Sequence, residues 1–144
     1  MSDDAGLLAV ARVRRVRETD SRIGLQTALA EQRDAQKRCD DLRRRLTAAD
    51  QFAAGSAADF VALRGSLQVL GMVLLAAVDE LDQTRTIAAA ALEAWKRDRA
   101  KLAAIEGLLE RRATARRTEV ARSEARELDD LATQRWLRRG GEVA

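Results

Sequence analysis

Apolar residues in the second half of the chain recur at alternating spacings of three and four. The repeat runs from residue 60 to residue 109 without a slip, and apart from Thr84 and Asp98 every one of its positions is apolar. This spacing keeps one stripe of a helix facing a partner helix. The sequence therefore predicts a long coiled-coil helix, whose seam consists of Phe60, Leu63, Leu67, Leu70, Leu74, Ala77, Leu81, Thr84, Ala88, Ala91, Trp95, Asp98, Leu102, Ile105 and Leu109.

The first part of the chain carries a similar repeat that is regular only in its second half. The seam positions there are Leu25, Ala28, Gln32, Ala35, Cys39, Leu42, Leu46, Ala49 and Ala53. Val13, Val16 and Ile23 fall in a different phase. We therefore expect a first helix over about residues 3–54, with a stutter near residues 20–25 that unwinds the supercoil locally.

Helix-ending and helix-starting residues stand next to each other between the two repeats. Gly55 suits the left-handed position that often follows the last residue of a helix. Ser56 and Asp59 have the spacing of a capping box, in which each side chain bonds the other residue's backbone N–H. The sequence therefore predicts a hairpin turn at residues 55–57.

The second predicted helix, over about residues 58–139, is longer than the first. At 1.5 Å per residue it would measure on the order of 120 Å, against about 75 Å for the first helix. Folded back from the turn, the first helix reaches only to the neighbourhood of Leu109, although Gly65 and Gly71 allow a break near residues 65–71. We expect an all-α fold: a long antiparallel two-helix coiled-coil hairpin with a protruding C-terminal helix, as a single domain over residues 1–144.

Composition supports long helices and speaks against a catalytic centre. The chain has no Pro to break a helix and no His, which is the commonest general base and metal ligand. Its single cysteine, Cys39, falls on the seam, where a buried apolar role is expected. The acidic pairs Asp40–Asp41 and Asp129–Asp130 are adjacent, so their side chains diverge on a helix. We therefore expect no enzyme activity, no metal site and no cofactor.

Charge and hydropathy limit the compartments and the classes of partner that we expect for this chain. The 26 basic and 23 acidic residues are interleaved, which describes a solvated surface rather than a nucleic-acid-binding face. The longest uncharged apolar run, residues 69–78, is shorter than the ~18 residues that cross a bilayer. We expect a cytoplasmic protein with no nucleic-acid partner and no direct membrane insertion.

The stretch at residues 67–78 is apolar on all sides rather than on one stripe. Off-seam apolar residues here are Val69, Met72, Val73, Leu75 and Val78, which we call the tip patch. A two-helix hairpin cannot bury both faces of one helix, so the patch either docks a partner or is covered by short helices that fold over it.

Two segments carry family motifs. Residues 7–30, LLAVARVRRVRETDSRIGLQTALA, form a basic and hydrophobic stretch with an Arg-Glu pair and then an Ala-Leu-Ala segment. Residues 94–136 are similar to the pattern KLxxLxERR followed by ExxELDELAxRR, although Ala104, Ala113 and Ala115 stand where acids are common. The matching residues are Trp95, Lys101, Leu102, Leu108, Glu110, Arg111, Arg112, Glu124, Arg126, Glu127, Leu128, Asp129, Asp130, Leu131, Ala132 and Arg135. The chain resembles the flagellar FliJ family, the small coiled-coil protein of the flagellar type III export apparatus, over nearly its whole length.

The resemblance implies a stalk that enters the central hole of a hexameric export ATPase, contacts the cytoplasmic domain of the membrane export gate and escorts export chaperones. It implies a location at the cytoplasmic face of the inner membrane. The tip patch would then face the gate. The basic residues near the two termini would face the ATPase: Arg12, Arg14, Arg15, Arg111, Arg112, Arg116 and Arg117.

Two other readings share this architecture. The equivalent stalk of a virulence-type secretion system would give the same repeats. A generic coiled-coil scaffold would also give them, and salt-sensitive DNA binding would favour a nucleoid-associated version of it.

Overall fold

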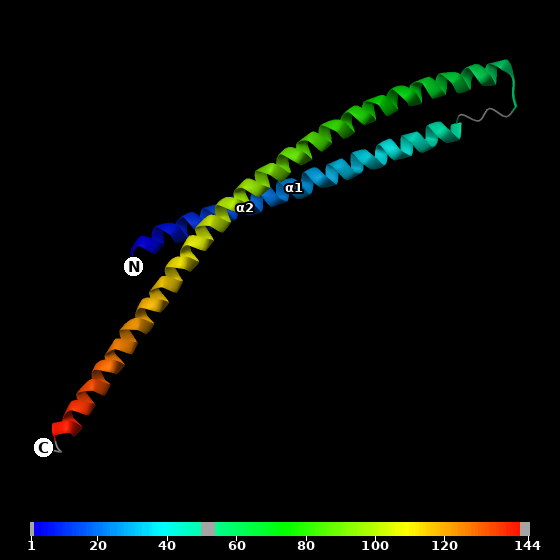
Figure 1. Ribbon diagram of the computed structural model, residues 1–144. Helices are drawn as coiled ribbons and strands as arrows, with labels where there is room; N and C mark the ends of the chain where they lie inside the picture. The colour runs from blue at the N-terminus through cyan, green and yellow to red at the C-terminus, as the bar shows by residue number, and fades with distance from the viewer. Residues whose placement is uncertain (1, 50–53, 142–144) are drawn as a thin grey trace. The chain divides into compact units, whose positions relative to one another are not determined.

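Within the part of the chain that the structure describes there are two helices (Figure 1). The computed structural model describes residues 2–49 and 54–141, with α1 at Ser2–Ala49 and α2 at Ala57–Gly141. The helix predicted over about residues 3–54 is described as far as Ala49, and its last seam position, Ala53, lies outside the described residues. The all-α fold is confirmed.

Helix α2 continues through residues 65–71, where the two glycines had allowed a break. The expected cost of a glycine in a helix is about 1 kcal/mol relative to alanine. Leu63 before the segment, Leu67 and Leu70 within it and Leu74 after it are all half-buried and lie in the same phase. The seam therefore holds the helix together across both glycines.

Contacts between the helices show that they run in opposite directions. Glu18 of α1 bonds Trp95 of α2 at 2.9 Å, whereas Arg38, later in α1, bonds Glu80, earlier in α2, at 2.6 Å. The partner number falls as the α1 number rises, which is the signature of an antiparallel pair. The hairpin is therefore confirmed.

The chain divides into two compact units. The hairpin unit comprises Arg14–Ala100, and the terminal unit comprises Met1–Val13 with Lys101–Ala144. The core of the hairpin unit is a cluster of Ala35, Cys39, Ala77 and Leu81, with Leu42 and Val78 packed against it. Cys39 is fully buried, as its seam position predicted.

The predicted seam agrees with burial over most of both helices. In α1 every predicted position from Leu25 to Ala49 is buried or half-buried, and in α2 the same holds from Leu63 to Leu109. Phe60 is the exception, with 44% of its surface exposed. It lies in the first turn of α2.

The predicted stutter near residues 20–25 is wrong. Val13, Val16 and Ile23 are 55%, 60% and 54% exposed, so they do not belong to the seam. The 3/4 spacing instead continues toward the N-terminus in its original phase, through protected residues that are largely polar. These are Asp4, Leu7, Ala11, Arg14, Glu18 and Ser21.

The start of α2 is capped as predicted. Asp59 N–H donates to Ser56 Oγ at 3.2 Å, and Ser56 N–H donates to Asp59 Oδ2 at 2.9 Å. Gly55 has a φ of 158°, which is close to extended and not the left-handed helical conformation we expected. Residues 50–53 lie outside the described part of the chain, and α2 begins two residues after Gly55, at Ala57.

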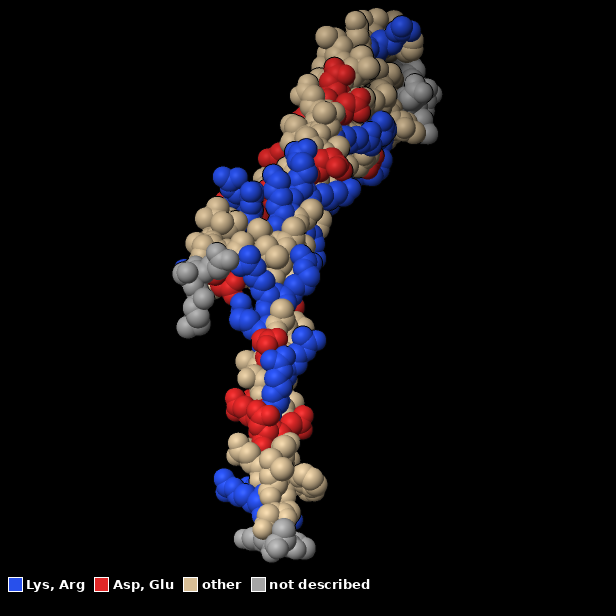
Figure 2. Space-filling view, turned by 60° about the vertical axis from the view of Figure 1, so that its left-hand side comes forward, with Lys and Arg blue, Asp and Glu red and all other residues tan. Residues whose placement is uncertain are grey.

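The C-terminal part of α2 has no packing partner among the described residues. Every residue from 114 to 141 is exposed, including Leu131 and Trp136, at 50% and 72%. Figure 2 shows acidic and basic side chains alternating along this single helix. The protruding C-terminal helix is therefore confirmed, and we call residues 114–141 the overhang.

Candidate binding surfaces

A polar layer interrupts the apolar seam of the hairpin unit. Glu18 is only 6% exposed, and its carboxylate accepts a hydrogen bond from Trp95 Nε1 at 2.9 Å. The guanidinium of Arg99 lies 5.5 Å from the centre of the Trp95 ring, within cation–π range. One helical turn away, Ser21 Oγ bonds the carboxylate of Asp98. These bonds satisfy polar groups that would otherwise be costly to bury.

Sequence reasoning missed this layer, although a signal was present. Glu18 and Ser21 extend the 3/4 spacing of Leu25 and Ala28, and on the other helix Asp98 was already a polar seam position. A polar seam residue on one helix is evidence for a polar residue opposite it. Val16 and Ile23 are more apolar than Glu18 and Ser21, so hydrophobicity alone did not identify Glu18 and Ser21 as seam residues.

In the terminal unit, Asp4 holds two of the predicted ATPase-facing arginines. Its carboxylate bonds Arg112 at 3.2 Å and also bonds Arg116. The hydrogen bond from Arg112, followed by that from Arg116, holds the pKa of Asp4 below its usual 3.8, against the opposing effect of desolvation. Arg112 and Arg116 therefore lie together, anchored on the N-terminal turn of α1.

The other predicted arginines are distributed over both units. Arg12 and Arg111 are exposed in the terminal unit, where Arg117 pairs with Glu110 at 2.9 Å. Arg15 is exposed in the hairpin unit, whereas Arg14 is half-buried at a seam position. The structure thus brings together Arg112 and Arg116, and it places Arg14 within the helix pair.

Most of the tip patch is exposed. Val69, Met72, Val73 and Leu75 are 62%, 65%, 47% and 69% exposed. Val78 differs from the others because it is half-buried and packs against the core of the hairpin unit. No short helices cover the other four residues within the part of the chain that the structure describes. Figure 2 shows that the surface near the turn consists mainly of uncharged residues.

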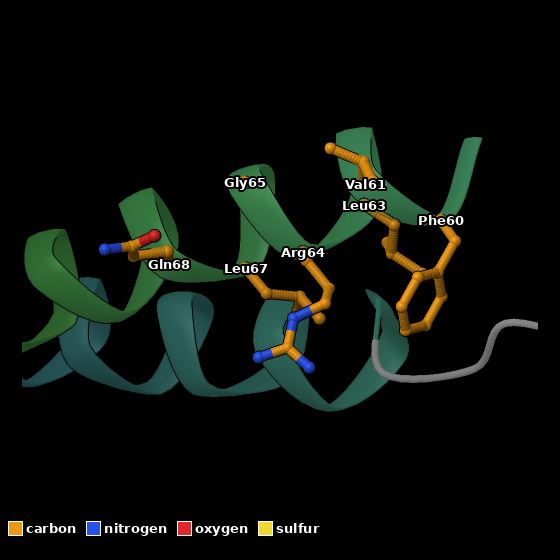
Figure 3. Close-up of a pocket in the computed structure, with 7 residues that line it drawn as sticks. All are labelled: Phe60, Val61, Leu63, Arg64, Gly65, Leu67 and Gln68. Carbon is orange, nitrogen blue, oxygen red and sulfur yellow. The ribbon is translucent and has the colours of Figure 1, made fainter. Parts of the chain in front are cut away.

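A hollow near the turn adjoins this patch (Figure 3). It is lined by Phe60, Val61, Leu63, Arg64, Gly65, Leu67 and Gln68. Arg64 is the one charged residue in the stretch 60–78. A second shallow hollow, lined in part by Gly65, Val69 and Val73, opens on the tip patch itself.

The same apolar stretch gives α2 the length and composition of a membrane-spanning helix. An 18-residue window of α2 has a mean hydropathy of 1.9, and only 6% of it is buried. Helices in the cores of soluble proteins can be equally apolar because they are buried, whereas nearly all residues of this window are exposed or half-buried. The described surface of α2 at residues 69–75 is therefore apolar and largely open to solvent.

The described side chains contain no arrangement typical of a metal centre. Within residues 4–49 and 54–141, no group of three or more His, Cys, Asp or Glu lies close enough together to hold a metal ion.

The described residues therefore form a helical hairpin with exposed apolar and basic surfaces. The family model described as "Flagellar FliJ protein" matches residues 4–141, nearly the whole chain. The chain belongs to this family, and it is a component of the flagellar export apparatus.

No curated protein and no solved structure matches the chain.

Proposed function

We propose that the chain is a stalk that couples a hexameric export ATPase to the cytoplasmic domain of the membrane export gate, and that it escorts export chaperones. It would act in the cytoplasm, peripherally at the cytoplasmic face of the inner membrane. The observation that carries this proposal is the exposed tip patch, because it is apolar, borders a hollow and has no covering element among the described residues.

The tip patch supports a protein contact on energetic grounds. Burying a valine, leucine or methionine side chain contributes about 1.5–3 kcal/mol. Val69, Met72, Val73 and Leu75 together offer enough apolar surface to drive docking of the gate domain, after the cost of association is met. Val78 is excluded from this set because its side chain already packs against the core of the hairpin unit.

The terminal unit supports the ATPase contact on electrostatic grounds. Arg12, Arg111 and Arg116 are exposed there, and Asp4 compensates only part of the positive charge. Basic side chains at the edge of an interface speed association with an acidic partner, and salt weakens that effect.

The gate contact is tested by changing two exposed residues of the tip patch. Met72→Ser combined with Leu75→Ser should weaken binding to the cytoplasmic domain of the gate at least tenfold and impair motility. The melting temperature should barely move, since surface substitutions usually change stability by about 0.5 kcal/mol or less. A matched control is Ile87→Ser with Val120→Ser, which removes apolar side chains that are 54% and 57% exposed elsewhere.

Three outcomes contradict the gate contact. The double variant could bind the gate domain like the native chain, or the control could weaken binding equally. Alternatively, the native chain could bind vesicles of anionic phospholipid through the tip patch and ignore the gate domain, which would assign the patch to a lipid surface.

The ATPase contact is tested separately. Replacing Arg12, Arg111 and Arg117 by glutamine should lower stimulation of the ATPase severalfold and reduce the salt dependence of binding, while the helical circular dichroism signal is unchanged. Arg112 and Arg116 are left intact in this variant because their pairs with Asp4 join the two helices. Unchanged stimulation would argue against this orientation of the stalk.

A further inference from the structure

Polar residues in the seam of the hairpin unit meet polar residues of the other helix. Trp95 Nε1 donates a hydrogen bond to the Glu18 carboxylate at 2.9 Å. Ser21 Oγ donates one to the carboxylate of Asp98. Among the described residues, no buried side-chain polar atom lacks a hydrogen-bond partner. The observed alignment of the two helices therefore satisfies the polar groups that the seam contains.

The buried cluster gives the register of the helix pair. Cys39 of α1 stands level with Ala77 of α2, and both belong to that cluster. Because the helices are antiparallel, Gln32, seven residues earlier in α1, stands level with Thr84, seven residues later in α2. Both are half-buried polar seam residues. The same count brings the four hydrogen-bonded residues of the previous paragraph to one level of the hairpin.

A slip of one heptad would leave the apolar part of the seam matched. If α1 advanced by seven residues toward the turn, Cys39 would face Leu70. Leu42, which stands level with Leu74 in the structure, would face Leu67. A shift of seven preserves a 3/4 repeat, and the hydrophobic effect has no direction of its own. Apolar burial therefore discriminates weakly between the two registers.

The connection between the helices is long enough for either register. In the observed register Ala49 stands level with Leu67, ten residues from the start of α2 at Ala57, which is about 15 Å along the axis. In the slipped register this offset would fall to three residues, about 5 Å. The seven residues between Ala49 and Ala57 can span about 25 Å when extended. The length of the connection therefore does not select the register.

The polar residues do distinguish the two registers. After the slip, Glu18 would face Ala91 and lose the hydrogen bond from its tryptophan donor. Ser21 would face Ala88 and lose its carboxylate acceptor. A buried polar group left without a partner is costly, whereas replacing both partners by apolar groups can be nearly neutral.

We propose that the polar seam residues act as a register lock, which holds the hairpin unit in one of two registers that its apolar seam alone would allow. A single polar residue in the seam of other coiled coils fixes their register in the same way. The lock needs no partner protein, so it stands whether or not the ATPase and gate contacts exist. It consists of Glu18, Ser21, Gln32, Thr84, Trp95 and Asp98.

The test measures the register directly. Spin labels are attached to Thr27→Cys and Gln68→Cys, two exposed positions of the hairpin unit, in a chain that carries Cys39→Ala. A slip of one heptad toward the turn brings the labels about 10 Å closer along the helix axis. Dipolar electron paramagnetic resonance, with labelled chain diluted in unlabelled chain, reads this distance within one molecule. The native lock should give one distance.

Removing the lock should release the register. In an apolar variant, a second and shorter distance should appear, with the slipped fraction at least tenfold above that of the native lock and the helical content unchanged. A matched control, Leu74→Ala, weakens the apolar seam but leaves the lock intact, so it should keep the single distance. The apolar variant carries Glu18→Leu, Ser21→Ala, Gln32→Leu, Thr84→Val and Asp98→Leu.

Moving the lock should move the register. A transposed variant shifts the α2 part of the lock by one heptad and keeps the amino-acid composition. The new tryptophan and aspartate stand level with Ser21 and Glu18 only in the slipped register, so the shorter distance should predominate. The transposed variant carries Ala88→Trp, Ala91→Asp, Trp95→Ala and Asp98→Ala.

Each of four results overturns the proposal. The apolar variant could keep the single long distance, or the Leu74→Ala control could also slip, which would make the register a matter of overall stability. The transposed variant could keep the long distance or lose its helical signal, either of which would mean that the moved residues do not find their partners. Finally, the native lock could already show both distances.

Discussion

At the scale of single residues, Glu18 and Trp95 determine how a polar layer fits into an apolar seam. The Glu18 carboxylate is almost completely buried, and the Trp95 ring supplies both apolar area and the one donor seen at 2.9 Å. A tryptophan suits this position because it can pack against the seam and still donate from its ring nitrogen. Trp95 is thus a large seam residue, as the sequence predicted, with an additional polar role.

Trp95→Phe should therefore destabilise the hairpin unit by about 1–3 kcal/mol, because Glu18 would stay buried without its donor. Adding Glu18→Leu should recover part of that loss, since both polar partners are then replaced by apolar groups. Urea denaturation followed by circular dichroism measures both effects. If the double variant loses as much unfolding free energy as the two single variants together, the hydrogen bond between the residues does not stabilise the fold.

Several exposed ion pairs of the helices form at another spacing than the sequence suggests. The acids Asp40, Asp41 and Glu93 have bases four residues later, which is a favourable helical spacing. In the structure they pair three residues later instead, for example Asp40 with Arg43 at 3.5 Å and Glu93 with Lys96 at 3.1 Å. Both spacings lie on one helix face, and exposed pairs contribute little either way.

At the scale of elements, α2 begins at a sequence-encoded cap. Ser56 and Asp59 exchange hydrogen bonds in the predicted way. The backbone N–H of Ser56, followed by its hydroxyl, holds the pKa of Asp59 below 3.8. The cap fixes where α2 starts, so it also fixes which residues the seam presents to α1.

Ser56→Ala should lower the free energy of unfolding by about 1 kcal/mol at neutral pH, the usual cost of losing an N-cap side chain. Because the folded-state pKa of Asp59 is lowered, its contribution is present above the unfolded pKa near 3.8 and is lost as the pH falls through the folded value. The loss caused by Ser56→Ala should therefore shrink below pH 3.8 in urea denaturation. A loss that stays constant down to pH 2 would contradict this role of Asp59.

At the scale of the whole molecule, two units of unequal packing share the same pair of helices. The hairpin unit has a buried cluster around Cys39, whereas the terminal unit contains the exposed overhang. The described cross-helix ion pairs of the terminal unit join Asp4 to Arg112 and Arg116, and they are partly exposed. Such pairs are weakened by salt, and most of the stability of a helix in a protein comes from packing, which the overhang lacks among the described residues.

Heating should therefore unfold the terminal unit before the hairpin unit. In a Trp136→Phe variant, tryptophan fluorescence reports only Trp95 of the hairpin unit, while circular dichroism at 222 nm reports all helices. The dichroism signal should begin to fall at a lower temperature than the fluorescence changes, and 0.5 M salt should widen the gap. Coincident curves in both probes would mean that the chain unfolds as one cooperative unit.

The sequence by itself determined the two helices, their antiparallel arrangement and most of the seam between them. Absence of Pro allowed long helices, and Ser56 with Asp59 placed the start of α2. The 3/4 repeat identified the seam from Leu63 to Leu109, because burial in a helix pair depends on a period that sequence shows directly.

Only the tertiary structure decided the phase of the first part of α1. Hydrophobicity favours Val16 and Ile23 over Glu18 and Ser21 as seam residues, which is why the sequence suggested a stutter. A continuous helix keeps the phase that its better-packed end sets at Ala28, Ala35 and Cys39. The polar residues become acceptable in the seam because Trp95 and Asp98 of α2 supply their hydrogen bonds. Those partners lie 77 residues away in sequence, beyond the reach of any local pattern.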